Sequence, residues 1–282
     1  MQNLLYEVDD VELILNDPNY ILVDCRFDLS NEHWGYSDYL KGHIPGAFYA
    51  DLNKNLSSPP TVNSGRHPLP AQDEFIAFLS ELGINKNRTV LLYDTTFGSF
   101  AVRLWWLLHS YGHLKTFLIN GGFQAWVAKG YPIETIIPEK KPALFDGKFT
   151  GQNLIDQKEI EKNLNDQNYL LIDARSPLRY QGIEEPIDKI AGRIPGAINI
   201  FHQDHLDKNG YLLPETDLRA MYVFLKDFKN EENIILYCGS GVTSCFNLFV
   251  LSYIGMDKPR LYAGSWSEWI QDPKHPIIKK ER

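Results

Sequence analysis

Short aliphatic runs alternate along this 282-residue chain with longer stretches in which apolar residues recur every three or four positions. Residues 170–174 (LLIDA), 197–200 (AINI) and 233–237 (NIILY) are typical of buried strands, because they are short and rich in Ile and Leu. The stretches 217–228 (DLRAMYVFLKDF) and 245–255 (CFNLFVLSYIG) have helical spacing. Strands that alternate with helices predict an α/β fold with a mainly parallel sheet flanked by helices.

The same motifs occur twice in the same order. The four pairs are 21–26 (ILVDCR) with 170–175 (LLIDAR), 42–47 (GHIPGA) with 192–197 (GRIPGA), 90–94 (VLLYD) with 234–238 (IILYC), and 121–126 (GGFQAW) with 264–269 (GSWSEW). The sequence therefore predicts two copies of one domain, at residues 1–137 and 151–282. Residues 138–150 carry Pro, Gly and charge without periodicity, which is typical of a linker.

Composition limits the partners and the location of the protein. Acidic residues outnumber basic ones by 36 to 28, which gives a formal net charge of −8. A nucleic-acid or anionic-membrane surface needs a net basic footprint, so we expect neither partner. No apolar run approaches the length of a membrane span, and the N-terminus (MQNLLYEVDD) lacks a basic and apolar leader, which favours a cytoplasmic protein.

The three cysteines, Cys25, Cys238 and Cys245, are too few for a disulfide framework. Their spacing relative to one another and to His is not that of a zinc site, so no metal is expected. They are interpreted as individual thiols.

Cys238 stands where a predicted strand ends and a predicted helix begins. The loop that follows consists of the small residues Gly239, Ser240, Gly241, Val242, Thr243 and Ser244. Two glycines allow successive backbone N–H groups to converge on one point, and the helix N-terminus adds to the same positive field. A thiolate is favoured there, which indicates a nucleophilic cysteine.

A nest around a thiolate suits either phosphoryl or sulfur transfer. Cysteine phosphatases use a CX5R loop whose arginine binds the phosphate oxygens, but the sixth residue after Cys238 is Ser244. A persulfide carries a single charge that N–H and hydroxyl groups can satisfy, so sulfur transfer is preferred. In the first copy Asp94 occupies the position of Cys238, and a carboxylate cannot act as a sulfur nucleophile. The first copy is therefore expected to be inactive.

The chain resembles the tandem-domain rhodanese sulfurtransferases over essentially its whole length. Residues 238–244 (CGSGVTS) are similar to the CGSGVT loop of the 3-mercaptopyruvate sulfurtransferase branch, whereas thiosulfate-preferring animal rhodaneses carry basic residues there. Further stretches similar to that branch are 93–94 (YD), 103–106 (RLWW), 111–113 (YGH) and 262–269 (YAGSWSEW). The resemblance implies two tandem rhodanese-like domains, of which the second is catalytic.

The resemblance also implies the reaction. A sulfane sulfur would pass from 3-mercaptopyruvate to a Cys238 persulfide, and from there to an acceptor thiol, such as thioredoxin or a small thiol, or to cyanide. No metal or organic cofactor is implied.

Donor-binding residues follow from the same resemblance. It places the arginine that binds the donor carboxylate at Arg179, and the planar fork of a guanidinium matches a carboxylate. It places the family's cleft acid and histidine at Asp51 and His67. The branch has a second arginine where this chain has Ile187, and Lys189 is the expected replacement cation.

Other functions remain open from the sequence alone. Thiosulfate is the alternative donor for the same nucleophile, and a non-catalytic module that binds a partner or senses oxidants through its thiol is a second function class. Phosphate or arsenate chemistry is disfavoured by the missing loop arginine.

Several of these residues also have plainer interpretations. Arg179 could form only a surface ion pair, and Asp51 and His67 could only stabilise turns. Cys245 and Cys25 are expected to pack in the core. Asp24 and Asp173, each two residues before an arginine, are expected to form strand-end ion pairs or caps.

Overall fold

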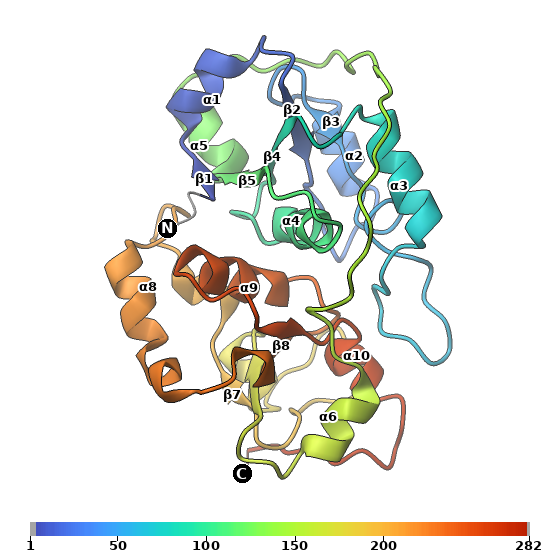
Figure 1. Ribbon diagram of the computed structural model, residues 1–282, viewed down its shortest axis with the longest axis vertical. Helices are drawn as coiled ribbons and strands as arrows, with labels where there is room; N and C mark the ends of the chain where they lie inside the picture. Colours follow the sequence, from blue (N-terminus) through green and yellow to red (C-terminus); the bar gives the residue numbers. More distant parts are fainter. Residues whose placement is uncertain (1–3, 281–282) are drawn as a thin grey trace.

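The computed structural model describes residues 4–280, and the chain forms two similar α/β halves stacked on each other (Figure 1). The first half has a five-stranded parallel sheet in the order β1-β5-β4-β2-β3. Its strands are β1 (Leu5–Tyr6), β2 (Tyr20–Asp24), β3 (Phe48–Tyr49), β4 (Thr89–Tyr93) and β5 (Thr116–Ile119). Its helices are α1 (Val8–Ile14), α2 (Trp34–Tyr39), α3 (Gln72–Glu81), α4 (Ala101–Ser110) and α5 (Gly122–Ala128).

The second half has a four-stranded parallel sheet in the order β7-β6-β8-β9. Its strands are β6 (Leu170–Asp173), β7 (Ile198–Asn199), β8 (Ile234–Tyr237) and β9 (Arg260–Leu261). Its α-helices are α6 (Gln157–Asn163), α7 (Pro177–Tyr180), α8 (Glu215–Met221), α9 (Ser244–Tyr253) and α10 (Ser265–Trp269), and 3₁₀ turns occupy His202–His205, Val223–Asp227 and Glu231–Asn233. The α/β fold class and its parallel sheets are confirmed.

Equivalent hydrogen bonds recur in the two halves. The Tyr93 hydroxyl accepts from the Ile44 N–H as the Tyr237 hydroxyl accepts from the Ile194 N–H, at 3.1 and 3.3 Å. The predicted strand-end ion pairs are also present, since Arg26 binds Asp24 and Arg175 binds Asp173, each at 2.6 Å. The sequence repeat is thus a repeat of side-chain contacts as well as of backbone.

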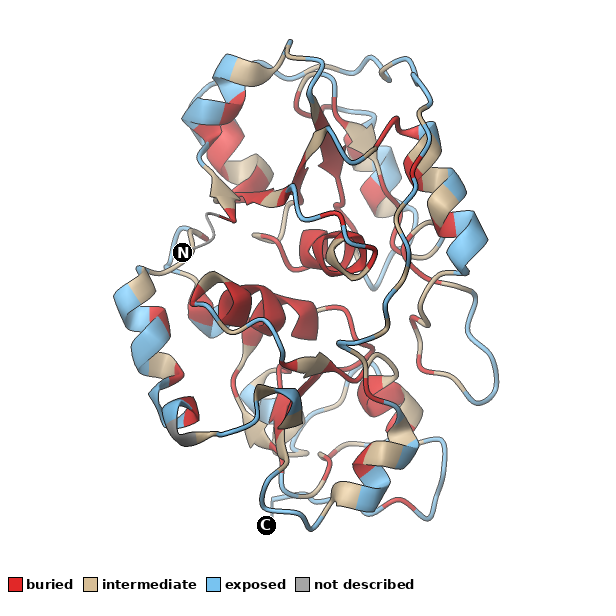
Figure 2. Ribbon diagram, viewed as in Figure 1, coloured by how far each residue is buried: buried red, intermediate tan, exposed pale blue. Residues whose placement is uncertain are grey.

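Helices α4 and α9 pack against each other where the two halves meet (Figure 1). Residues 101–108 of α4 and 244–252 of α9 are all buried, and Figure 2 shows both helices almost entirely in the colour of buried residues. The Trp105 and Phe249 rings meet edge to face with centroids 5.2 Å apart. Because one hydrophobic cluster includes residues of both halves, the two halves share a core.

One predicted helix is shorter than expected. The helical spacing of apolar residues predicts one helix over residues 217–228. In the structure α8 ends at Met221, and a 3₁₀ turn follows at Val223–Asp227. This tighter winding keeps Tyr222 and Leu225 buried while Val223 and Phe224 remain exposed.

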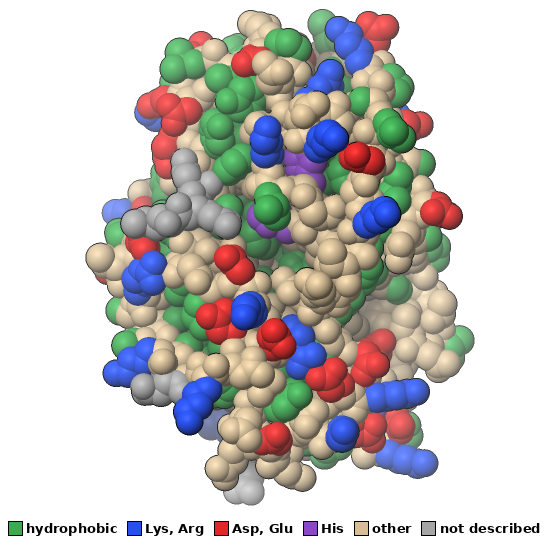
Figure 3. All heavy atoms as spheres, viewed as in Figure 1, with side chains coloured by type: hydrophobic (Ala, Val, Ile, Leu, Met, Phe, Trp, Pro, Cys, Tyr) green, Lys and Arg blue, Asp and Glu red, His purple; other side chains and the backbone are tan. Residues whose placement is uncertain are grey.

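The connection between the halves has no helix or strand over residues 138–150. It is not detached, because Phe145 is buried against the Tyr111 ring of the first half. The limits 1–137 and 151–282 remain predictions. None of the helices between residues 4 and 280 is long and apolar enough to cross a membrane. Acidic and basic side chains are interspersed on the face that Figure 3 shows.

Candidate active site

Cys238 follows β8, and its loop is held from the other side by the start of α10. The Cys238 N–H donates to the Ser265 hydroxyl at 3.1 Å, and the Cys238 carbonyl accepts from the Trp266 N–H at 3.0 Å. Gly241 has a φ of +72°, and a β-carbon there would lie 2.3 Å from the Ala263 carbonyl oxygen. Glycine is therefore required at this position, where two loops meet.

The surroundings of Cys238 favour its thiolate. Burial opposes ionisation, but the Thr243 and Ser244 hydroxyls and the N–H groups of Ser240 and Ser244 outweigh it, so the pKa of Cys238 lies below its ordinary value. The Ser244 hydroxyl is buried and has no other hydrogen-bond partner among the described residues. It is thus free to donate to the sulfur.

The thiol faces a cavity of about 170 Å³ between the two halves. It is smaller than the roughly 300–1,000 Å³ pockets that hold drug-sized ligands, so it suits a small donor. Its lining consists of Leu29, Arg66, Phe100, Arg175, Ser176, Arg179, Phe201, His202, Cys238, Gly239, Ser240, Val242 and Thr243. The first half therefore contributes part of the wall.

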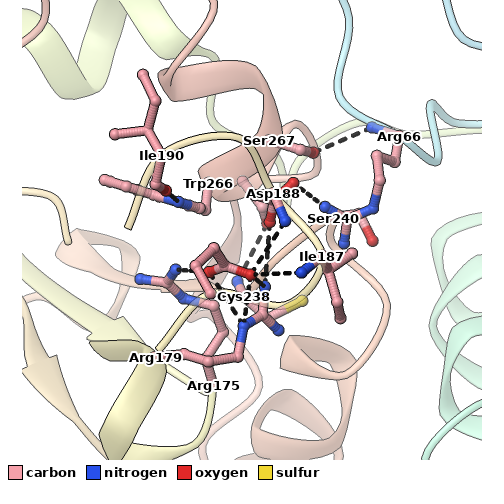
Figure 4. A network of polar contacts seen from close by, with 12 residues as sticks. Arg66, Arg175, Arg179, Ile187, Asp188, Ile190, Cys238, Ser240, Trp266 and Ser267 are labelled. Atoms are coloured by element: carbon pink, nitrogen blue, oxygen red, sulfur yellow. Dashed lines mark hydrogen bonds and ion pairs between the residues drawn. The ribbon is translucent and has the colours of Figure 1, made fainter. Parts of the chain in front are cut away.

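Arg179, which the resemblance implies as the donor-binding arginine, lines this cavity. Its Nε donates to Glu185 at 3.0 Å and its Nη2 to Asp188 at 3.0 Å (Figure 4). In the first half the matching residue is Asp38, because the next residue is in each case the tyrosine that bonds an alanine carbonyl. Asp38 binds Arg26, the repeat equivalent of Arg175. Where the first half has an acid in a structural ion pair, Asp38, the second half thus has a cation that lines the cavity, Arg179.

Arg66 is a cavity residue that the sequence analysis missed. It comes from the loop between β3 and α3 of the first half, and its guanidinium binds Asp188 (Figure 4). Its backbone N–H donates to the Ser267 hydroxyl at 3.0 Å. Only its position next to His67 could have indicated it, since the loop has no periodic pattern.

His67 reaches the site through Ser240. Its Nδ1 atom and the Ser240 hydroxyl oxygen are hydrogen-bonded at 2.7 Å across the two halves. Burial, with the nearby charges of Arg66 and Arg103, lowers the pKa of His67 to about 3, so the imidazole is neutral near pH 7. Arg103 fixes this arrangement, because it donates to the carbonyls of His67 at 3.2 Å and Gly241 at 3.0 Å.

Of the four expected substrate-binding residues, Asp51, His67 and Lys189 do not line the cavity. The Asp51 carboxylate accepts from the N–H groups of Asn53 and Lys54 at 2.9 and 3.1 Å, which is a turn-stabilising arrangement. Lys189 is exposed and lies outside the cavity lining. Ile187 is also exposed, and its N–H donates to Glu185 at 3.2 Å.

The other two thiols, Cys25 and Cys245, are buried in surroundings that disfavour the thiolate. Burial raises the pKa of Cys245 to about 12, although Arg103 lies close by, and burial also raises the pKa of Cys25. All three cysteines are free. Within residues 4–280 no group of three His, Cys, Asp or Glu side chains is arranged to hold a metal ion.

The corresponding loop of the first half contains its own anion. Asp94 Oδ1 accepts from the N–H groups of Thr96 and Gly98 at 2.7 and 2.8 Å. Its Oδ2 accepts from Phe100 and Ala101 at 2.8 and 2.9 Å. The nest that surrounds a thiol in the second half is therefore filled by a carboxylate in the first.

Known proteins share this arrangement of two halves. The family model described as "Rhodanese-like domain" matches residues 7–129 and again residues 156–272. The chain is 41% identical over 265 residues to "Probable 3-mercaptopyruvate sulfurtransferase" of Pseudomonas aeruginosa, covering 93% of each. It is 30% identical over 259 residues to "Thiosulfate sulfurtransferase" of Bos taurus, covering 89% of this chain and 85% of that one. The solved "3-mercaptopyruvate sulfurtransferase from Leishmania major" superposes with a TM-score of 0.83 at 33% identity, covering 94% of this chain and 74% of that chain.

Proposed function

The chain belongs to the rhodanese family, with two copies of its domain, and on this basis we propose that it is a sulfurtransferase whose nucleophile is Cys238. The observation that carries the proposal is the loop at the end of β8. There a cysteine with a lowered pKa faces a cavity for a small ligand. The first half, with Asp94 in the matching nest, supplies no sulfur nucleophile.

The reaction has two steps. The Cys238 thiolate attacks the sulfur of 3-mercaptopyruvate, an S–S bond forms and the donor C–S bond breaks. The bonding pair stays on carbon, which takes up the thiol proton, so pyruvate leaves and a Cys238 persulfide remains. An acceptor thiolate then attacks the outer sulfur, giving an acceptor persulfide and regenerating the Cys238 thiolate. Between the two steps, the converging N–H and hydroxyl groups of residues 240–244 stabilise the terminal sulfur of the persulfide.

The proposal covers both the sulfur donor and the sulfur acceptor. The donor is a small sulfur compound, and 3-mercaptopyruvate is proposed because the Arg179 fork fits a carboxylate and the loop around Cys238 carries no basic residue. The acceptor is a thiol, such as thioredoxin or a small thiol, or cyanide. A reducing compartment such as the cytoplasm suits a nucleophile that must remain a free thiolate.

Thiosulfate is the second candidate donor. Three arginines line the cavity, and the bovine relative is among those named for thiosulfate. Their charges are largely matched by Asp173, Glu185 and Asp188, which favours a donor with one negative charge over a dianion.

The test is kcat/KM for 3-mercaptopyruvate and for thiosulfate with one acceptor, for the wild type and Cys238→Ser. We expect a preference for 3-mercaptopyruvate, and loss of both activities in the variant. A preference for thiosulfate would overturn the proposed donor. Turnover of neither donor by a folded wild-type protein with an intact thiol would overturn sulfur transfer and favour a binding or sensing module.

A further inference from the structure

Two guanidinium groups converge on the residue next to the nucleophile. A β-carbon on Gly239 would lie 2.8 Å from Arg66 Nη2 and 3.3 Å from Arg179 Nη2. Arg179 comes from α7 of the second half, whereas Arg66 comes from the loop before α3 of the first. A donor whose sulfur is in reach of Cys238 therefore lies within reach of both cations.

Asp188 arranges these two arginines as a pair. One of its oxygens binds the Arg66 guanidinium and the other accepts from Arg179 Nη2 at 3.0 Å (Figure 4). The Asp188 side chain is only 4% exposed, whereas that of Arg66 is 28% exposed. Arg66 thus keeps N–H donors available on the cavity side, while the ion pair with the buried Asp188 fixes the position of its guanidinium.

Close contacts also fix the backbone of Arg66, as Asp188 fixes its side chain. A β-carbon on the preceding residue, Gly65, would lie 2.4 Å from the Gly264 carbonyl oxygen, so this close approach of two backbones requires glycine. The Arg66 N–H donates to the hydroxyl of Ser267 in α10, which begins directly after Gly264. Arg103 donates to the carbonyl of the following residue, His67. A surface ion pair would not need such precise placement of its backbone.

Arg175, the third arginine of the cavity, is not available in the same way. It binds Asp173 at 2.6 Å, Glu185 at 3.3 Å and the Gly192 carbonyl at 2.7 Å. Its equivalent Arg26 makes the same kind of contacts in the half that has Asp94 in place of Cys238. A structural role therefore explains Arg175 and leaves Arg66 and Arg179 for a ligand.

We propose that Arg66 binds the carboxylate of the sulfur donor together with Arg179, so that the first half supplies a specificity-determining residue for a site whose nucleophile lies in the second. The proposal rests on the function proposed above. Arg66 also supplies the second cation that Ile187 cannot, since its partner Asp188 directly follows Ile187 in the chain.

Steady-state kinetics test the proposal directly. Arg66→Met is expected to raise KM for 3-mercaptopyruvate by roughly 10- to 100-fold with little change in kcat. The reason is that the charged hydrogen bond to the donor is lost equally from the bound ground state and from the transition state. Arg219→Met, which removes an arginine from an exposed ion pair on α8, is the matched control. Arg66→Met combined with Ile187→Arg is expected to recover much of the lost affinity.

Alkylation of Cys238 tests the same contact without any sulfur transfer. Iodoacetate carries a carboxylate and iodoacetamide is its neutral counterpart. Arg66→Met is expected to lower the iodoacetate rate several-fold relative to the iodoacetamide rate, and Arg66→Lys, which keeps the charge but not the fork, to lower it less. Because this ratio does not depend on turnover, it separates failure of this inference from failure of the proposed function.

Three results would overturn the inference. One is an unchanged KM and an unchanged alkylation ratio in folded Arg66→Met. Another is a parallel loss of Tm, kcat and iodoacetamide reactivity in Arg66→Met and Arg66→Lys, which would make Arg66 a structural clamp. The third is a rise in KM in Lys189→Met without one in Arg66→Met.

Discussion

The three cysteines of this protein show how far the immediate surroundings decide the chemistry of a residue. All three are buried, and burial alone disfavours a thiolate. Cys25 and Cys245 follow this rule, with raised pKa values. At Cys238 the hydroxyl and N–H donors directed at the sulfur outweigh burial and lower the pKa, whereas the Arg103 donor at Cys245 does not outweigh it. Its reactivity is a property of residues 240–244.

The pH dependence of Cys238 alkylation follows from this shift. Because the pKa of Cys238 is lowered from 9.0, the thiolate fraction and the iodoacetamide rate should rise with pH through a midpoint below 9.0 and then level off. His67, with a pKa of about 3, should add no second inflection near neutral pH. The rate is measured against pH, with Cys238→Ser as the control. A midpoint at or above 9.0, or labelling of the control, would contradict this account.

At the scale of the element, one strand-loop-helix unit occurs in two versions. In the loop between β4 and α4 and in the loop between β8 and α9, N–H groups converge on the residue that directly follows the strand. An anionic side chain at that position stabilises either loop. An aspartate makes the unit a structural turn, whereas a cysteine makes it a reactive one.

The stability of the first loop should therefore depend on its carboxylate. Asp94→Ala leaves four backbone N–H groups without their acceptor and should lower the free energy of unfolding by about 2–4 kcal/mol. Urea unfolding measures the change. Asp28→Ala, which removes a carboxylate that bonds only the nearby residues Ser30 and Asn31, is the control and should cost much less. Equal effects of the two substitutions would show that the nest needs no anion.

Elements of this kind were predictable from the sequence where periodicity or repetition defined them. The strands, the helix after Cys238 and the duplication all follow from short aliphatic runs, from helical spacing and from paired motifs. The role of Arg66 was not predictable, because residues 50–70 contain no periodic pattern and their course depends on contacts with the other half. Asp51 was placed by resemblance, and only its hydrogen bonds reveal the turn that it stabilises.

At the scale of the whole molecule, the site exists because the two halves are fixed against each other. Arg103 of α4 is completely buried and binds carbonyl oxygens of both halves, those of Leu56 and Gly241 among them. The shared core between α4 and α9 holds the same interface. The half that contains Cys238 is therefore not expected to keep its cavity alone.

Unfolding of the intact chain should accordingly be a single cooperative transition by calorimetry. Phe249→Ala removes a fully buried ring from the interface and should lower stability by about 3–5 kcal/mol, shifting that one transition as a whole. Phe224→Ala, at a ring that is 42% exposed, is the matched control and should have a much smaller effect. Two separate transitions, or a Phe249→Ala shift in only one of them, would show that the halves are independent.

The most direct test of the central claim is mass spectrometry of the protein after one equivalent of 3-mercaptopyruvate is added without an acceptor. The account predicts one added sulfur atom, located on Cys238 rather than Cys245 by the fragment ions of the peptide that contains both, and its removal when a thiol acceptor is supplied. An unmodified protein, or a sulfur atom on Cys25 or Cys245 instead, would contradict it.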